Sequence, residues 1–157
     1  MSAIIPRNSA PLLRQLTDHF PAVEVLGARQ VGKSTLTQQV SEELASAGTS
    51  VASFTMDDPE TRSVALDDPR GFLAQNPGGM LVIDEFQRVP ELILSLKAEI
   101  DRYRRPGRFL ITGSSQLTTG TAAADSLAGR VASLQMRGFS QGELSGMRDD
   151  FVSRTLG

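Results

Sequence analysis

Short apolar runs and longer amphipathic stretches follow one another along this chain, and their spacing predicts alternating strands and helices. Strands are indicated where a few residues run apolar, or alternate with polar ones, between turn residues such as Gly, Pro and Asp. The segments of this kind are 23–26, 51–56, 80–83, 109–111 and 131–136. The run 80–83 is apolar throughout and ends abruptly at Asp84, as expected of a parallel strand buried on both faces.

Helices are predicted where apolar residues recur three or four positions apart. Asn8 or Ser9 can cap the first helix, which has Pro11 in its first turn. Its apolar side consists of Leu12, Leu13, Leu16 and Phe20. A second helix begins near residue 34 and stops at Gly48. Its apolar positions are Leu36, Val40, Leu44 and Ala47.

A third strong helix is predicted over 90–104, ended by the Pro106-Gly107 pair. Its apolar face carries Ile93, Leu96, Ile100 and Tyr103. A short helix is expected at 60–65, and a turn or short helix anchored by Phe72 and Leu73 within 67–79. The segment 116–125 is small and polar, which favours a loop or a weak helix.

Strands separated by helices, without an internal repeat, predict a three-layer α/β domain on a mainly parallel, five-stranded sheet. With 157 residues, the chain has the size of one ordinary domain. We expect a lead-in helix within 1–20 and the main domain at 21–140. The stretch 141–157 is predicted to be a polar tail or the start of a linker to a C-terminal domain missing from this sequence.

The stretch from Gly27 to Ser34 fits G-x-x-x-x-G-K-[ST], a phosphate-binding loop between a strand and a helix. Glycines let backbone N–H groups point inward, and the following helix N-terminus favours an anion. Lys33 is expected to reach the outer phosphates of a nucleoside triphosphate. The expected binding residues are Gly27, Ala28, Arg29, Gln30, Val31, Gly32, Lys33, Ser34 and Thr35. The alternative is a glycine turn with an incidental lysine.

Two acidic residues at the end of the strand 80–83 are candidates for metal binding and catalysis. Ser34 and Asp84 are expected to hold Mg²⁺, because hydrolysis of a terminal phosphate needs a positioned metal ion. Glu85 is the candidate for activating the attacking water, since its side chain leaves the strand tip in another direction. An acidic pair that merely ends a strand is the alternative interpretation.

Three further residues are candidates for the same reaction. Thr112 and Ser114 follow the strand 109–111, where a hydroxyl could sense the γ-phosphate or hold the water; a simple turn is the alternative. Arg130 could stabilise the developing charge, in its own site or in that of a neighbouring subunit, or it could hold a loop through a salt bridge. Asp57 and Asp58 could reach the nucleotide, although helix capping is the preferred interpretation.

Composition narrows the remaining possibilities. The formal net charge of −2 gives no general attraction to nucleic acid, and the absence of cysteine excludes disulfides and thiol catalysis. The single histidine, His19, cannot build a histidine metal site and is expected at the surface. No apolar run approaches the roughly 20 residues of a membrane span, so we expect a cytoplasmic protein without a membrane partner.

A local basic cluster could bind DNA or a protein partner, although a solvated helix end is the simpler interpretation. Its members are Arg102, Arg104, Arg105 and Arg108.

Taken together, these segments resemble the ATPase half of bacterial and archaeal AAA-type proteins with a DUF4143 C-terminal domain. The resemblance is carried by 27–34 as Walker A, Asp57-Asp58-Pro59, 83–91 as an extended Walker B, 106–114 and 126–130. It implies an ATP-binding and ATP-hydrolysing core of the additional-strand type, with Thr112 or Ser114 in the sensor position. It also implies a second domain downstream, in a family whose cellular role is poorly defined.

The leading hypothesis is therefore an ATPase that uses Mg²⁺, as the motor or switch half of a larger protein that could assemble as a homo-oligomer. A nucleotide-switched binding module for protein or DNA, with negligible turnover, is the alternative. A small-molecule phosphotransferase is disfavoured, because the Asp84-Glu85 pair better suits water activation. GTP specificity is disfavoured because no Asn-Lys-x-Asp segment is present.

Overall fold

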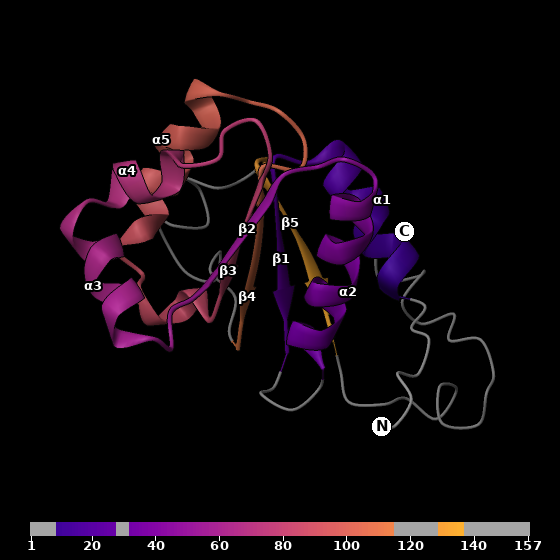
Figure 1. The fold of residues 1–157 in the computed structure, drawn as a ribbon, viewed down its shortest axis with the longest axis horizontal. Helices are drawn as coiled ribbons and strands as arrows, with labels where there is room; N and C mark the ends of the chain where they lie inside the picture. The colour runs from indigo at the N-terminus through magenta and orange to yellow at the C-terminus, as the bar shows by residue number, and fades with distance from the viewer. Residues whose placement is uncertain (1–8, 28–31, 115–128, 137–157) are drawn as a thin grey trace.

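The computed structural model describes residues 9–27, 32–114 and 129–136, which form a sheet between two helical layers (Figure 1). The strands are β1 (Ala22–Leu26), β2 (Val51–Thr55), β3 (Met80–Asp84), β4 (Phe109–Gly113) and β5 (Val131–Gln135). The helices are α1 (Ser9–His19), α2 (Lys33–Ser46), α3 (Pro59–Asp67), α4 (Pro69–Ala74), the 3-10 turn η1 (Phe86–Arg88) and α5 (Leu92–Arg102). Helices α1 and α2 cover one face of the sheet, and α3, α4 and α5 cover the other.

The sheet has five strands in the order β2-β3-β4-β1-β5, and every neighbouring pair is parallel. The predicted three-layer, five-stranded α/β fold is thus confirmed. Strand β4 lies between β1 and β3, as the additional-strand type requires. Because parallel strands all end at the same edge of a sheet, the ends of β1, β3 and β4 lie close together there, although they are far apart in sequence.

Alternating side chains divide the core into two clusters, one on each face of the sheet. Phe109 and Ile111 of β4 pack toward one cluster, with buried residues of α4 and α5, whereas Leu110 packs toward the other, with α1 and α2. Strand β3 divides in the same way, with Ile83 on the first side and Val82 on the second. Burial on both faces explains why residues 80–83 of β3 and 109–111 of β4 are apolar throughout.

The predicted helix over 90–104 is shorter in the structure. Helix α5 begins at Leu92, because Pro90 lies in the preceding turn, where its carbonyl accepts a hydrogen bond from Ile93 N at 3.1 Å. It ends at Arg102, because the backbone of Tyr103 leaves the helical region, with φ at −133°. The expectations for 116–125 and for the tail at 141–157 lie outside the described residues, as does Asn8 as a cap.

The basic cluster predicted as a possible DNA-binding surface is not one solvated helix end, and for Arg108 both interpretations were wrong. Arg108 is 2% exposed, and its guanidinium donates to Glu99 Oε2 at 3.0 Å and to the Tyr103 carbonyl at 3.3 Å. Arg105 donates to the backbone carbonyls of Pro77 and Pro106. These bonds hold the turns at the amino ends of β3 and β4.

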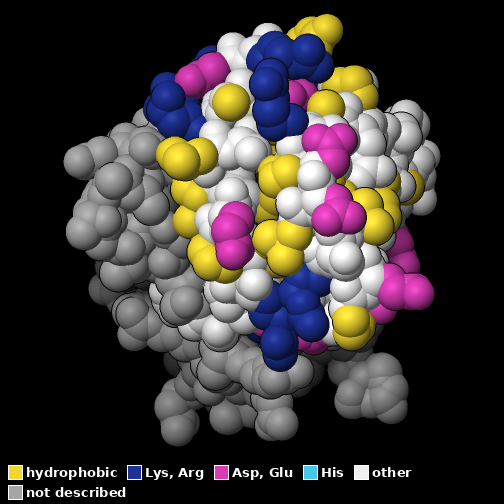
Figure 2. All heavy atoms as spheres, turned by 90° about the vertical axis from the view of Figure 1, so that its left-hand side faces the viewer, with side chains coloured by type: hydrophobic (Ala, Val, Ile, Leu, Met, Phe, Trp, Pro, Cys, Tyr) yellow, Lys and Arg dark blue, Asp and Glu magenta, His cyan; other side chains and the backbone are white. Residues whose placement is uncertain are grey.

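The other two arginines of the cluster are exposed but also have protein partners. Arg102 pairs with Glu99, and Arg104 donates to the Gly129 carbonyl at 2.9 Å. Figure 2 shows the face formed by α3, α4 and α5, where acidic side chains lie beside the basic groups. The sequence pattern did not predict this arrangement, because the contacts of Glu99 with Arg102 and Arg108 depend on how the chain folds.

Among the described residues, no helix combines the length and apolar character that crossing a membrane would require.

The buried pair of Glu99 and Arg108 yields a stability prediction. Glu99→Ala should lower the free energy of unfolding by about 3 kcal/mol, because it leaves a buried guanidinium without its carboxylate. Lys97→Ala, which removes an exposed pair with Asp101 on the same helix, should cost less than about 1 kcal/mol. Urea unfolding of both variants tests this, and equal losses would contradict the structural role assigned to Arg108.

Candidate functional site

The predicted phosphate-binding loop contains two described glycines, one on each side of its residues 28–31. Gly27 follows β1 and donates its N–H to the Gly113 carbonyl of β4 at 3.2 Å. Gly32 precedes α2 with φ at +89°, a left-handed conformation that favours glycine, and no described side chain caps this helix end. The first N–H groups of α2 therefore remain available to an anion. Ala28, Arg29, Gln30 and Val31 lie outside the described residues.

Lys33, the first residue of α2, reaches the end of β3. Its side chain is 1% exposed, and Nζ lies 3.3 Å from Glu85 Oε2. Glu85 has φ at +57° and ψ at +48°, an uncommon conformation for a residue with a side chain. This left-handed turn ends β3 and starts η1, so Glu85 does not continue the alternation of the strand. The structure thus brings together the two residues predicted to bind phosphate and to activate water.

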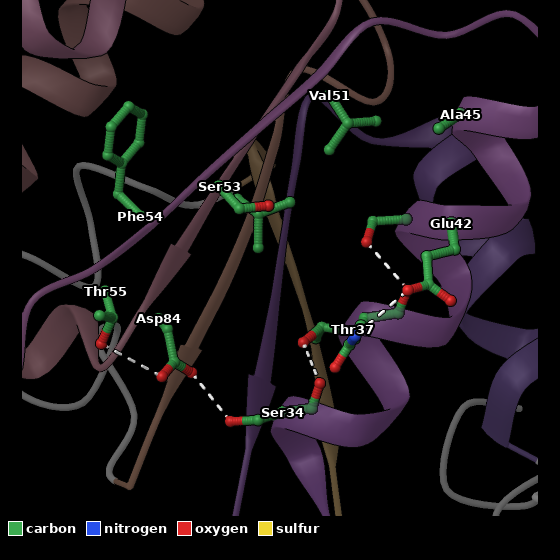
Figure 3. Close-up of a pocket in the computed structure, with 12 residues that line it drawn as sticks. Ser34, Thr37, Glu42, Ala45, Val51, Ser53, Phe54, Thr55 and Asp84 are labelled. Atoms are coloured by element: carbon green, nitrogen blue, oxygen red, sulfur yellow. Dashed lines mark hydrogen bonds between the residues drawn. The ribbon is translucent and has the colours of Figure 1, made fainter.

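The carboxylate of Asp84 accepts hydrogen bonds from hydroxyl groups of three other elements. Ser34 Oγ donates to Oδ1 at 3.1 Å, and Thr55 Oγ1 of β2 donates to Oδ2 at 3.4 Å (Figure 3). Thr112 Oγ1 of β4 also donates to Oδ1. Carboxylate and hydroxyl oxygens are ligands that Mg²⁺ accepts, together with phosphate oxygens and water. The donor set of Ser34 and Asp84 therefore fits the predicted ion, while Thr35 is exposed in the first turn of α2.

The end of β4 contacts the same acidic residues. Glu85 N donates to Thr112 Oγ1 at 3.1 Å, so Thr112 bonds to both members of the acidic pair. Ser114 N donates to Gln87 Oε1 at 3.3 Å, and Gln87 Nε2 donates to Glu85 Oε1 at 2.6 Å. The hydroxyl of Thr112 thus lies between the two acidic residues, whereas Ser114 contributes its backbone to these contacts.

Two polar residues at this edge were missed as site residues. Thr55 ends β2, and the rule that parallel strands end at one edge could have placed it beside Asp84. Gln87 lies in the extended Walker B segment, but its position in the sequence relative to the other candidate residues did not predict a role in the site.

Arg130 lies at the opposite edge of the sheet. Its carbonyl accepts from Ala22 N at the start of β1, about 13 Å of strand away from the loop end of β1. Its guanidinium donates to both carboxylate oxygens of Asp101, at 2.7 and 3.2 Å. These hydrogen bonds lower the pKa of Asp101 and raise the pKa of Arg130. Arg130 therefore lies away from the described site residues of its own chain, and its ion pair with Asp101 agrees with the salt-bridge alternative.

The aspartates after β2 have structural partners. Asp58 caps α3 by accepting from Thr61 N at 3.2 Å and from Thr61 Oγ1 at 2.6 Å, and these bonds lower the pKa of Asp58. Asp57 pairs with Arg88, with 2.5 Å between Oδ1 and Nε. The preferred capping interpretation is confirmed for Asp58.

An open groove of about 530 Å³ runs between α2 and strands β2 and β3 (Figure 3). Ser34 and Asp84 lie at one end of it, and Ala45 and Val51 line its other end. The groove therefore leaves the proposed ligands of the metal ion open to solvent.

Comparison with known proteins identifies the family of this arrangement. A family model described as "AAA domain" (AAA_14) matches residues 19–145, most of the chain. An uncharacterized protein of Mycobacterium bovis, Mb2031c, is 36% identical over 135 residues, which are 85% of this chain. The chain spans only 29% of the length of that relative.

Solved structures agree with this at the level of the fold. A DNA replication initiation factor has a TM-score of 0.63 at 10% identity, covering 98% of this chain and 57% of its own. DnaA of Aquifex aeolicus bound to AMPPCP has a TM-score of 0.59 at 12% identity, covering 98% and 58%. The described residues therefore share the fold of these proteins.

The ion pair between Lys33 and Glu85 predicts how the site responds to an anion. Pyrophosphate must draw Lys33 away from Glu85, so Glu85→Gln should bind it about tenfold more tightly than the parent chain. Glu43 lies on α2, as Lys33 does, and forms an exposed pair with Arg14 of α1; Glu43→Gln should leave the affinity unchanged. Titration calorimetry measures all three proteins, and unchanged or weaker binding by Glu85→Gln would contradict the competition.

Proposed function

This chain belongs to the AAA domain family, and we propose from this premise that it binds ATP at the start of α2 and hydrolyses it with Mg²⁺. One observation carries the proposal: Lys33 and Ser34 of the loop lie against Glu85 and Asp84, respectively. Four residues with complementary roles in phosphate chemistry thus meet at one edge of the sheet. A glycine turn with an incidental lysine gives no reason for that meeting.

Binding of the triphosphate uses groups that the chain already presents. The uncapped N–H groups of α2 supply donors, and Lys33 supplies a cation with little exposure to water. A phosphate oxygen would replace Glu85 as the partner of Lys33. Glu85 Oε2 would then be free to accept a hydrogen bond from a water molecule.

Ser34 and Asp84 are the residues that would hold Mg²⁺. The ion, when bound, neutralises the negative charge that develops on the phosphate oxygens. Thr112 and Thr55 donate to Asp84, so they orient its carboxylate toward Ser34. Ligand orientation by such surrounding hydrogen bonds is general in metal sites.

Glu85 is the general base in this proposal. Its carboxylate accepts a proton from water as the water oxygen bonds to the γ-phosphorus, and the bond from that phosphorus to the bridging oxygen breaks. The products are ADP and inorganic phosphate. Thr112 supports this role by accepting the Glu85 N–H, which fixes the left-handed turn from which the carboxylate projects.

A neighbouring copy of the chain would supply positive charge from Arg130. That residue lies at the amino edge of the sheet, so it can serve a site only across a subunit boundary. A homo-oligomer is therefore part of the proposal. We place the chain as the motor or switch half of a larger protein, which the greater length of the M. bovis relative supports.

A nucleotide-switched binding module is the second candidate. It is favoured by the contacts that α2, β3 and β4 make through Lys33, Glu85 and Thr112, because ATP binding must rearrange them. A protein or DNA partner could read that rearrangement without turnover. ATP affinity without release of phosphate would select this candidate.

Substitutions of Glu85 and Lys33 separate binding from hydrolysis. Glu85→Gln should retain ATP but cleave it at least about 100-fold more slowly, because the general base is lost. Lys33→Ala should abolish nucleotide binding. Glu91→Gln, an exposed glutamate before α5, is the control and should behave as the parent. Calorimetry and phosphate release measure the two steps, and parental cleavage by Glu85→Gln would remove Glu85 from its role.

Action of Arg130 across a boundary predicts complementation. Arg130→Ala alone should lower turnover about a thousandfold. Its residual turnover should therefore be about as low as that of Glu85→Gln. A mixture of the two should recover activity, because intact sites then meet intact arginines. Arg104→Ala, which alters the same edge of the sheet, should need no complementation. Two results together would contradict this arrangement: turnover per subunit that does not change with protein concentration, and no recovery of activity in the mixture.

A further inference from the structure

Gln87 links the carboxylate of Glu85 to the backbone of Ser114, which follows β4. It is the second residue of η1, and its amide contacts Glu85 on one side and the end of β4 on the other. Nε2 donates to Glu85 Oε1 at 2.6 Å, and Oε1 accepts from Ser114 N at 3.3 Å. The side chain is half-buried; its bond to Glu85 is partly buried, whereas its bond to Ser114 is exposed.

The two contacts fix the orientation of the amide. Exchanging its nitrogen and oxygen would place an N–H₂ group against the Ser114 N–H and an oxygen against a carboxylate. Both of those contacts are repulsive, so only the observed orientation satisfies both neighbours. Gln87 therefore holds the Glu85 carboxylate at a set place relative to the backbone of β4.

The Gln87 bond becomes more important when nucleotide binds. Glu85 has two described partners for its carboxylate, Lys33 at Oε2 and Gln87 at Oε1. If Lys33 turns to a phosphate, Gln87 is the partner that remains. The adjacent residue of β4, Gly113, accepts the N–H of Gly27, so the anchor of Gln87 is itself tied to the start of the phosphate loop.

We propose that Gln87 is a positioning residue that holds the Glu85 carboxylate in place for its reaction with water. The inference rests on the proposed function, because it concerns the general base of that reaction. It predicts that loss of the amide slows the chemical step and leaves ATP binding intact.

Two variants distinguish positioning from the filling of space. Gln87→Met keeps a similar length but cannot form the hydrogen bonds, and it should lower kcat about tenfold with KM and ATP affinity within about twofold of the parent. Gln87→Glu has nearly the same shape, but it places a second carboxylate against Glu85 and should be at least as slow. A residue that only fills space would tolerate Gln87→Glu best. Gln75→Met, which loses one bond to the Phe72 carbonyl, is the matched control and should have parental kcat.

A second readout needs no nucleotide. In nitrogen-15 NMR spectra of the nucleotide-free chain, Glu85→Gln should shift the side-chain amide signals of Gln87, because a charged acceptor becomes neutral. Gln87→Met should shift the backbone signal of Ser114, which loses its acceptor. The side-chain signals of Gln75 should stay in place in both variants.

Each outcome decides one of the two proposals. Two results would overturn the positioning role while leaving the ATPase proposal intact. One is a parental kcat in Gln87→Glu, and the other is that the side-chain amide signals of Gln87 do not shift in Glu85→Gln. Absence of ATP cleavage by the parent chain would overturn the proposed function, and the NMR shifts would then still decide whether Gln87 holds Glu85. Slow Gln87→Met and Gln87→Glu with unchanged affinity, together with the shifts, would support the inference.

Discussion

A buried ion pair between Lys33 and Glu85 joins the first turn of α2 to the end of β3. A lysine that is almost wholly removed from water is unfavourable unless a carboxylate or another anion neutralises it. The position of β4 between β1 and β3 makes the pair possible, because it separates the loop after β1 from the acidic residues at the end of β3 by the width of one strand. Thr112 fills that middle position and bonds to both acidic residues.

The same contacts explain how the site can be stable without nucleotide and still receive one. Carboxylates of Asp84 and Glu85 satisfy the hydroxyl of Ser34 and the charge of Lys33, so neither polar group is left unpaired. A phosphate oxygen would replace Glu85 as the partner of Lys33, and a metal ion would replace the direct hydrogen bond between Ser34 and Asp84. Binding therefore exchanges one anion for another at Lys33 and a hydrogen bond for metal ligation at Ser34, and its cost is the loss of the existing bonds. The left-handed turn at Glu85 and the amide of Gln87 keep the released carboxylate close to the strand tips.

Much of this arrangement could be predicted from residue patterns. The apolar run closed by Asp84 and the spacing of Gly27, Gly32 and Lys33 indicated the strand, the loop and the helix that the structure contains. The amide contact of Gln87 could not be predicted, because it depends on a backbone conformation at Glu85 that composition does not encode. Arg108 was misjudged for a related reason, since an arginine usually marks a surface and its burial depends on Glu99 being close in space. The position of Arg130 just before the last predicted strand could be read from the sequence, but only the strand register shows at which edge of the sheet it lies.

The exchange of partners at Lys33 can be observed directly by determining the structure of the chain with Mg²⁺ and a non-hydrolysable ATP analogue. The account predicts that Lys33 Nζ contacts a phosphate oxygen and no longer Glu85, with the metal ion on Ser34 and Asp84. An analogue bound elsewhere, with the Lys33–Glu85 pair intact, would contradict it.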